Sequence, residues 1–298
     1  MLVKSNPLIM AVLASFFFAF STFISKLLGQ GLVGEPMHPF QIAHARFTFG
    51  LVGASLLLLY WNKNFSRPNL KLHLLRCFLG WLGVSILFTG VIYIPAADAV
   101  ALSFMNPIFA MIFAIYILNE KVDSFLWIAV GCSFIGALIL IRPEGNQFNF
   151  VAFLCLIGAA AFGLEIVITK LISTTENIVQ ILFINNFIGA GLATIPLYYF
   201  AKSPTTLQLF FFAAVGFTMV IGQALFLTAI RTSQASVVTP YIYSTIIFIV
   251  LLDWIILQIN PGMWSIVGAS FIICAGVYIA FKTDQKAKKL VKIRNYKS

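Results

Sequence analysis

The chain has 298 residues, of which 61% are hydrophobic and only 9% charged, and its mean hydropathy is +0.99. A soluble domain carries about 25% charged residues, so this chain has too few to cover a surface in water. Soluble enzymes, disulfide scaffolds, coiled coils and disordered chains are therefore excluded, and the sequence predicts a polytopic membrane protein. The net charge of +10 is explained by membrane topology rather than by a nucleic-acid partner.

Apolar runs of about 20 residues recur along the chain, and each is long enough to cross a hydrocarbon core of about 30 Å. The first follows the N-terminus with no cleavage site, so we expect a retained helix. The predicted fold is an all-α integral membrane protein with ten transmembrane helices, at residues 7–28, 39–60, 72–93, 96–117, 125–141, 149–171, 178–200, 207–229, 232–257 and 262–281.

Basic residues are distributed unevenly between the two sides of these spans. With the N-terminus inside, fifteen Lys and Arg residues, Arg76 among them, fall on the inner side. The outer side keeps Lys26, Arg46, Arg142 and Lys202. By the positive-inside rule we expect both termini in the cytoplasm, with residues 282–298 forming a basic tail beside anionic lipid.

The sequence also repeats itself. From Gly83 to Glu120 it matches the second half at an offset of 133, so that Ser103 pairs with Ser236 and Glu120 with Asp253. Earlier, SKLL at 25–28 matches TKLI at 169–172, and three further positions match at an offset of 139: Gln41, Gly50 and Tyr60 with Gln180, Gly189 and Tyr199. The repeating unit is five helices, which divides the chain into residues 1–142 and 143–281.

Because five is odd, the two copies must cross the membrane in opposite directions. Inverted repeats are typical of secondary transporters, in which the substrate site lies near the midplane between the copies. The alternative is a duplication fixed for structure alone, as in some channels and membrane enzymes.

The segments AVALSFMNPIFAMIFAIYILNEKV (99–122) and GCSFIGALIL (131–140), echoed by ASVVTPYIYSTIIFIVLLD (235–253), resemble the EamA-type transporters of the drug/metabolite transporter (DMT) superfamily. The resemblance covers essentially the whole chain. It implies a multi-pass protein of a bacterial inner membrane, and TPYIY looks like members that import S-adenosylmethionine or riboflavin. Members of the superfamily also move amino acids, nucleotides, sugars and drugs.

Pro107 and Pro240 occupy equivalent points inside predicted helices. Each proline removes a backbone donor and frees the carbonyl four residues earlier, which belongs to Ser103 or Ser236. The serine hydroxyls are expected to help satisfy these gaps. The prolines are either tolerated kinks or a source of exposed polar backbone for a substrate site.

Arg46 and Glu165 are charged residues inside predicted spans, where a charge is a site candidate by default. Arg46 is either a snorkelling arginine or a cavity residue that pairs with a carboxylate or an anionic substrate group. The equivalent positions are Asn185 and Asn186. Glu165 shares one helix face with Gly158, Phe162 and Thr169, and it is expected to make a packing contact or ion pair, or to carry a proton or bind a cation.

Other charged residues fall near the predicted helix ends. Asp98 follows Pro95 in a first turn, where the helix dipole favours a carboxylate, while Arg231 is a candidate loop anchor. The candidate gating or ion-pair residues are Lys26, Asp98, Glu120, Lys170, Arg231 and Asp253. The resemblance implies a central cavity lined by the third and ninth predicted helices, which contain or adjoin Trp81, Tyr93, Tyr241 and Tyr243. Asn106 and Gln223 are the remaining candidates for this cavity.

The predicted function is a secondary active transporter of a small organic metabolite (amino acid, vitamin, nucleotide-like or cationic compound), working by alternating access with or without proton coupling. The alternative is a channel or lipid scramblase. The chain carries no HExxH, paired DxxxD or Ser/His/Asp set, and its four cysteines lack metal-binding spacing, so an enzyme, a cofactor and a metal are not expected. A small-molecule substrate and the lipid bilayer are the expected partners, and the chain is either a monomer or a homodimer.

Overall fold

A computed structural model describes residues 7–61, 66–118, 124–141, 150–173, 175–232, 242 and 244–296. Within those ranges every regular element is a helix and no strand occurs. The helices are α1 (Pro7–Gly29), α2 (Pro39–Trp61), α3 (Leu70–Tyr93), α4 (Ala96–Ser103), α5 (Asn106–Leu118), α6 (Ser124–Ile141), α7 (Phe150–Ser173), α8 (Ile178–Phe200), α9 (Thr206–Thr232), α11 (Ser244–Leu257) and α12 (Met263–Tyr296).

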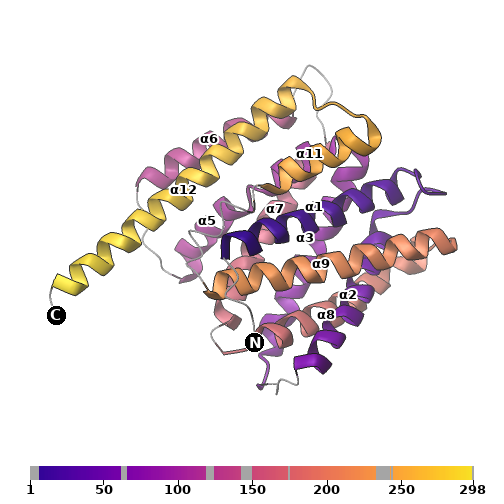
Figure 1. Ribbon diagram of the computed structural model, residues 1–298, viewed down its shortest axis with the longest axis horizontal. Coiled ribbons are helices and arrows are strands. Elements are labelled where there is room, and N and C mark those ends of the chain that lie inside the picture. The colour runs from indigo at the N-terminus through magenta and orange to yellow at the C-terminus, as the bar shows by residue number, and fades with distance from the viewer. Residues whose placement is uncertain are drawn as a thin grey trace.

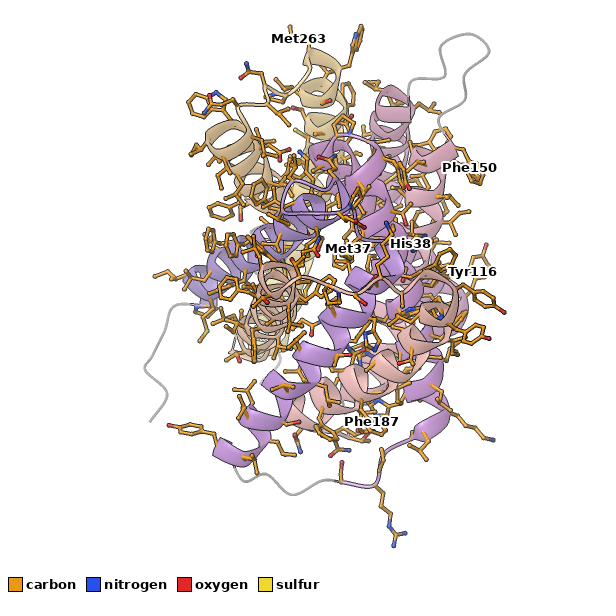
Figure 2. All side chains as sticks on the ribbon, turned by 90° about the vertical axis from the view of Figure 1, so that its right-hand side faces the viewer. Met37, His38, Tyr116, Phe150, Phe187 and Met263 are labelled. Atoms are coloured by element: carbon orange, nitrogen blue, oxygen red, sulfur yellow. The ribbon has the colours of Figure 1, made fainter. Side chains whose placement is uncertain are left out.

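Six of the described helices, α1, α2, α3, α7, α8 and α9, are long and apolar enough to cross a membrane. Large apolar side chains cover the outer surfaces of these helices and of α5, whose Tyr116 lies at the margin of the molecule in Figure 2. Tyr116 is 79% exposed and Phe187 is 61% exposed. A soluble protein rarely presents so much contiguous apolar surface, so the arrangement is that of an integral membrane protein.

The predicted span at 96–117 is two helices rather than one. The helix ends at Ser103 and restarts at Asn106, with a turn at Phe104 and Met105 between. The break comes just before Pro107, which occupies the first turn of α5, where a missing backbone N–H costs nothing. The hydroxyl of Ser103 does not fill the place of the N–H that Pro107 lacks. It donates to the carbonyl of Val100 at 2.7 Å.

The last helix is longer than expected, because α12 continues from Met263 to Tyr296 through most of the predicted tail. The segment KTDQKAKKLVKIRNY is rich in Lys, Ala and Leu, which are good helix formers. The basic tail therefore extends α12 without a break (Figure 1).

The long helices pack in antiparallel pairs. Along α1 and α9, Ala11 lies near Ala229 and the hydroxyl of Ser21 donates to the carbonyl of Val215. Along α3 and α7, an added Cβ at Gly83 would meet the ring of Phe162, and one at Gly90 would meet Cys155. In Figure 1, α6 and α12 form one flank of the molecule and α2 and α8 the opposite one.

The contacts between α2 and α8 are reciprocal. Gly50 of α2 lies against the amide of Asn186, and Gly189 of α8 lies against the ring of Phe47. Phe47 and Asn186 are themselves 139 residues apart in sequence, as are Gly50 and Gly189. Each position therefore contacts the counterpart of its partner, which is the pattern of two segments related by a twofold axis.

The two ends of this helix pair show the same reciprocity. Gln41 at the start of α2 donates to the carbonyl of Lys202 (2.6 Å) and accepts from its N–H (3.0 Å), just beyond the end of α8. Gln180 at the start of α8 donates to the carbonyl of Ser66 (3.0 Å) and accepts from its N–H (2.9 Å), beyond the end of α2. We call these contacts the Gln41 clamp and the Gln180 clamp. They lie at opposite ends of the bundle, so α2 and α8 run in opposite directions.

The glycines of α6 and α12 make their close contact within one chain. A Cβ at Gly136 would lie 2.8 Å from the carbonyl oxygen of Gly268, so the two helices approach through small residues. At Gly131 nothing lies within 4 Å.

Gly216 of α9 and Gly191 of α8 provide a matched test of helix packing. An alanine Cβ at Gly216 would lie 2.7 Å from the backbone nitrogen of Gly50, whereas Gly191 has nothing within 4 Å. We expect Gly216→Ala to destabilise the protein by about 1–3 kcal/mol through overpacking. Gly191→Ala is expected to be neutral or stabilising by up to about 1 kcal/mol through helix propensity. Thermal unfolding in detergent measures both, and equal melting temperatures would contradict the packing of α9 on α2.

Candidate functional site

Three charged side chains from different helices gather in the interior. Nη2 of Arg76 (α3) lies 3.3 Å from Oε1 of Glu165 (α7), and Nε of Arg76 donates to the hydroxyl of Thr169 at 2.6 Å. Arg46 (α2) interacts electrostatically with both Arg76 and Glu165. We call Arg46, Arg76 and Glu165 the central cluster.

The stripe of small and polar residues predicted on α7 determines where Glu165 lies. Gly158 packs against Ile86, Phe162 against Gly83, and the carboxylate of Glu165 against Gly80. The whole stripe therefore faces α3, whose glycines leave room for it. Glu165 makes an ion pair, which is one of the roles predicted for it. Its side chain nevertheless stays 18% exposed, so the pair leaves part of that side chain accessible.

Arg46 is buried to a greater degree, with an exposed fraction of 4%. Its guanidinium carbon lies 4.2 Å from the centre of the Phe47 ring, a cation–π contact. Nε and Nη1 of Arg46 are buried and have no hydrogen-bond partner among the described residues. Arg46 does not reach the surface, so the snorkelling reading does not describe this structure.

Aromatic rings and amides line the neighbouring parts of α2, α3 and α8. The ring of Trp81 packs between Phe40 (6.0 Å) and Phe78 (5.9 Å), and its indole Nε1 is buried with no described partner. Asn185 and Asn186 are both buried, and Asn186 donates to the carbonyl of Leu182. Trp81 therefore lies on α3 and Asn185 and Asn186 on α8, and their lining of a central cavity stays a prediction.

One end of the bundle, which we call the Asp253 end, is held by a buried ion pair. Nζ of Lys26 lies 2.7 Å from Oδ1 of Asp253, and the two side chains are 4% and 9% exposed. This contact joins the last turns of α1 and α11. Both residues are candidates for an ion pair by sequence, and the structure brings them together.

The Asp253 end also holds a cavity of about 460 Å³ lined by parts of four segments: Gly29, Pro36, Met37, His38, Pro39, Ile92, Tyr93, Tyr199, Phe200, Ala201 and Lys202. Met37 and His38 lie near the middle of the face seen in Figure 2. The ring of His38 stacks on Phe200 at 4.0 Å. Tyr93, expected in a central cavity, lies here instead and is 65% exposed, because it is the last residue of α3.

The opposite end, which we call the Glu176 end, is closed by a buried polar network. Nε2 of His73 lies 2.8 Å from Oε2 of Glu176, and Gln180 donates to the same oxygen at 2.7 Å. The backbone N–H of Asn69 donates to the other carboxylate oxygen at 3.3 Å. The network adds to the Gln180 clamp and ties the start of α3 to the loop between α7 and α8.

The other predicted residues fall in three groups. Asp98 and Ser103 are buried on α4, and Asn106 begins α5. Gln223 is partly buried on α9, and its Oε1 has no described partner. Ser236, Pro240, Tyr241, Tyr243 and Glu120 lie outside the described residues, as do the side chains of Pro107, Lys170 and Arg231.

Arg76, His73, Glu176 and Gln180 are not among the site residues that the sequence predicts. The sequence analysis counts Arg76 only with the inner-side charges, whereas the structure buries it inside the bundle, where it is 5% exposed. The predicted span at 72–93 contains it, so the rule for charges within spans applies. For His73 and Glu176 the sequence gives no signal, since their pairing depends on how α7 packs on α3.

Comparisons with known proteins agree with this architecture. The profile of the EamA-like transporter family matches twice, at residues 6–142 and 149–281. The S-adenosylmethionine uptake transporter of Rickettsia bellii is 25% identical over 87% of this chain and 89% of its own length. The riboflavin transporter of Vibrio cholerae is 29% identical (75% and 74%), and the pseudopaline exporter CntI of Pseudomonas aeruginosa is 26% identical (94% and 97%). A solved crystal structure superposes with a TM-score of 0.62 at 16% identity, covering 91% of this chain and 98% of that one.

The Lys26–Asp253 pair is testable by single and double substitution. Because breaking a buried pair leaves one charge unmatched, Lys26→Met and Asp253→Leu are each expected to destabilise the protein by about 3–5 kcal/mol. The double variant, which removes both charges, is expected to recover most of that loss. Thermal unfolding of the four proteins gives the interaction free energy between Lys26 and Asp253. If the loss in the double variant equals the sum of the two single losses, the two side chains do not stabilise each other.

His38 gives the Asp253 end a pH dependence. Burial lowers the pKa of His38 below its ordinary value of 6.5, and its Nδ1 accepts from the N–H of Phe40 at 3.3 Å only when unprotonated. Its contribution to stability is therefore complete above pH 6.5 and is lost as the pH falls below that value. His38→Asn, which copies the cap that Asn177 provides at the equivalent start of α8, is expected to remove this component.

The measurement compares melting temperatures at pH 7.5 and 5.5. The wild type is expected to lose more stability on acidification than His38→Asn does. An identical loss in both proteins would assign the pH dependence to other groups.

Proposed function

The chain belongs to the EamA-like transporter family, and we propose that it moves its substrate by alternating access between two inverted five-helix repeats, residues 1–142 and 143–281. The protein is a small-molecule transporter of the DMT superfamily and not an enzyme. It is a multi-pass protein of the bacterial inner membrane. The proposal concerns the mechanism, the number and direction of its ten spans, and the substrate class.

The reciprocal contacts of α2 and α8 carry this proposal. The Gln41 and Gln180 clamps are equivalent positions that close opposite ends of one antiparallel helix pair. Alternating access needs two ends of similar construction that open in turn around one site. The packing of α1 on α9, matched by that of α7 on α3, supports the same relation.

Charge gives the proposed orientation. The excess of Lys and Arg on the side of both termini favours a cytoplasmic location for that side. The Glu176 end would then face the cytoplasm and the Asp253 end the outside. In this arrangement the central cluster lies between the two closed ends, where a substrate site is expected.

The proposed substrate is a small organic metabolite, and two relatives supply the first candidates. The named cargoes of those relatives are S-adenosylmethionine and riboflavin. Arg46, Trp81 and Glu165 are the residues proposed to contact the substrate. Arg76 would hold Glu165 in place.

Exchange in proteoliposomes tests the mechanism. Proteoliposomes preloaded with unlabelled substrate are expected to take up labelled substrate faster than empty ones. The reason is that a carrier which returns to the outside with substrate bound can then import the next labelled molecule. Arg76→Gln, which removes the partner of Glu165, is expected to lower exchange by at least about tenfold. Protein-free vesicles and the Gly191→Ala variant serve as controls.

Flux that is unaffected by preloading and does not saturate would favour a channel or a lipid scramblase instead. Repeating the assay with a pH gradient tests coupling through Glu165 or Asp98. If both the wild type and Glu165→Gln ignore the gradient, the transporter does not couple to protons through Glu165.

A further inference from the structure

The central cluster carries an excess of positive charge. Two guanidinium groups, of Arg46 and Arg76, face a single carboxylate, that of Glu165. Glu165 is already engaged by Arg76, which also donates to Thr169. At neutral pH the three groups together have a formal charge of +1, and that charge resides on the arginine that makes no ion pair.

Arg46 is also unsatisfied as a hydrogen-bond donor. A guanidinium has five N–H donors, and the cation–π contact with Phe47 engages none of them in its plane. Nε and Nη1 of Arg46, and Nη1 of Arg76, are buried with no partner among the described residues. Buried charged donors without partners are costly. A purely structural role for Arg46 leaves that cost uncompensated.

We infer that Arg46 binds a carboxylate of the transported substrate, with Arg76 as the second donor, so that the cargo is a carboxylate-bearing metabolite. This inference rests on the proposed transport function and specifies its substrate. A carboxylate brings one negative charge and accepts several hydrogen bonds from a planar guanidinium. The carboxylate balances the +1 charge of the central cluster, and its oxygens supply acceptors for the buried donors.

The presence of Glu165 distinguishes a carboxylate from a doubly charged phosphate ester. A dianion would exceed the +1 charge of the central cluster and be repelled by the Glu165 carboxylate, whose side chain remains 18% exposed. A monoanion matches the +1 charge, and the Glu165 carboxylate repels it less strongly than it repels a dianion. Glu165 is also placed to favour a substrate that carries a positive group beside its carboxylate.

A mixed-pool efflux assay tests this. Proteoliposomes are loaded with equimolar sets, each consisting of a carboxylate, its decarboxylated or amidated counterpart and a phosphate monoester. One set is S-adenosylmethionine with its decarboxylated form, and riboflavin is added as a compound without a carboxylate. Mass spectrometry of the outside solution reports which compounds leave. We expect carboxylates to leave and their counterparts without a carboxylate to be retained.

Arg46→Gln is the decisive variant. Loss of a charge-assisted hydrogen bond is expected to lower efflux of the carboxylate compounds by about 10- to 100-fold, and so to remove most of the preference for them. Lys282→Gln removes the same charge on α12, far along the chain from the central cluster, and is expected to behave as wild type. Arg46→Lys keeps the charge without the planar fork and provides a second variant, and melting temperatures establish that each variant is folded.

The outcomes separate the inference from its premise. If counterparts without a carboxylate leave wild-type vesicles as fast as carboxylates, or if phosphate esters are preferred, the inference is wrong but the transport proposal is unaffected. If Arg46→Gln and Arg46→Lys keep the wild-type preference for carboxylates, the assignment to Arg46 is wrong. If wild-type protein releases no compound faster than protein-free vesicles, the transport proposal falls, and the inference falls with it.

Discussion

A charged side chain inside an apolar bundle must find an opposite charge or a set of hydrogen bonds, and this requirement shapes the interior of the protein. The described helices meet it at three levels along their length. Lys26 and Asp253 pair at one end, Arg76 and Glu165 near the middle, and His73 and Glu176 at the other end. Each pair joins segments that are distant in sequence, so the same contacts that neutralise charge also hold the bundle together.

Close packing makes these pairs possible, because ion pairs require helices to approach each other. On α3 the glycines at 80 and 83 admit the side chains of Glu165 and Phe162. Arg46 is the exception to the pairing rule, since its excess charge has no matching group in the described residues. Because an unpaired buried charge is costly, binding of a substrate group is the simplest physical explanation for Arg46.

Much of this architecture could be predicted from the sequence, because hydrophobic length and internal repetition are strong signals. The bounds of α1, α2 and α8 agree with the predicted spans within one residue, and the resemblance to EamA-type transporters is confirmed. The lengths of α4 and α12 were predicted less well. A proline does not reveal whether a helix bends or restarts, and a hydropathy pattern does not reveal where a polar helix continues beyond a membrane.

The site was predicted unevenly for a related reason. The pairing of Lys26 with Asp253 was within reach, because both charges lie near the ends of apolar spans. Arg76 was missed because its charge also fits the topology signal, and His73 with Glu176 because only three-dimensional packing brings them together. Periodicity predicts which face of a helix is polar, but it does not predict which neighbouring helix that face meets.

The reciprocal contacts of α2 and α8 have a consequence for how such a protein can change. In a dimer of identical chains, one substitution would alter both symmetric contacts at once. Here Gly50 receives an amide from Asn186 while Gly189 receives the ring of Phe47, so the two contacts already differ. In a single chain with proposed inverted repeats, each half can acquire substitutions independently. The contacts that close the bundle on one side of the membrane can therefore differ in stability from those on the other side.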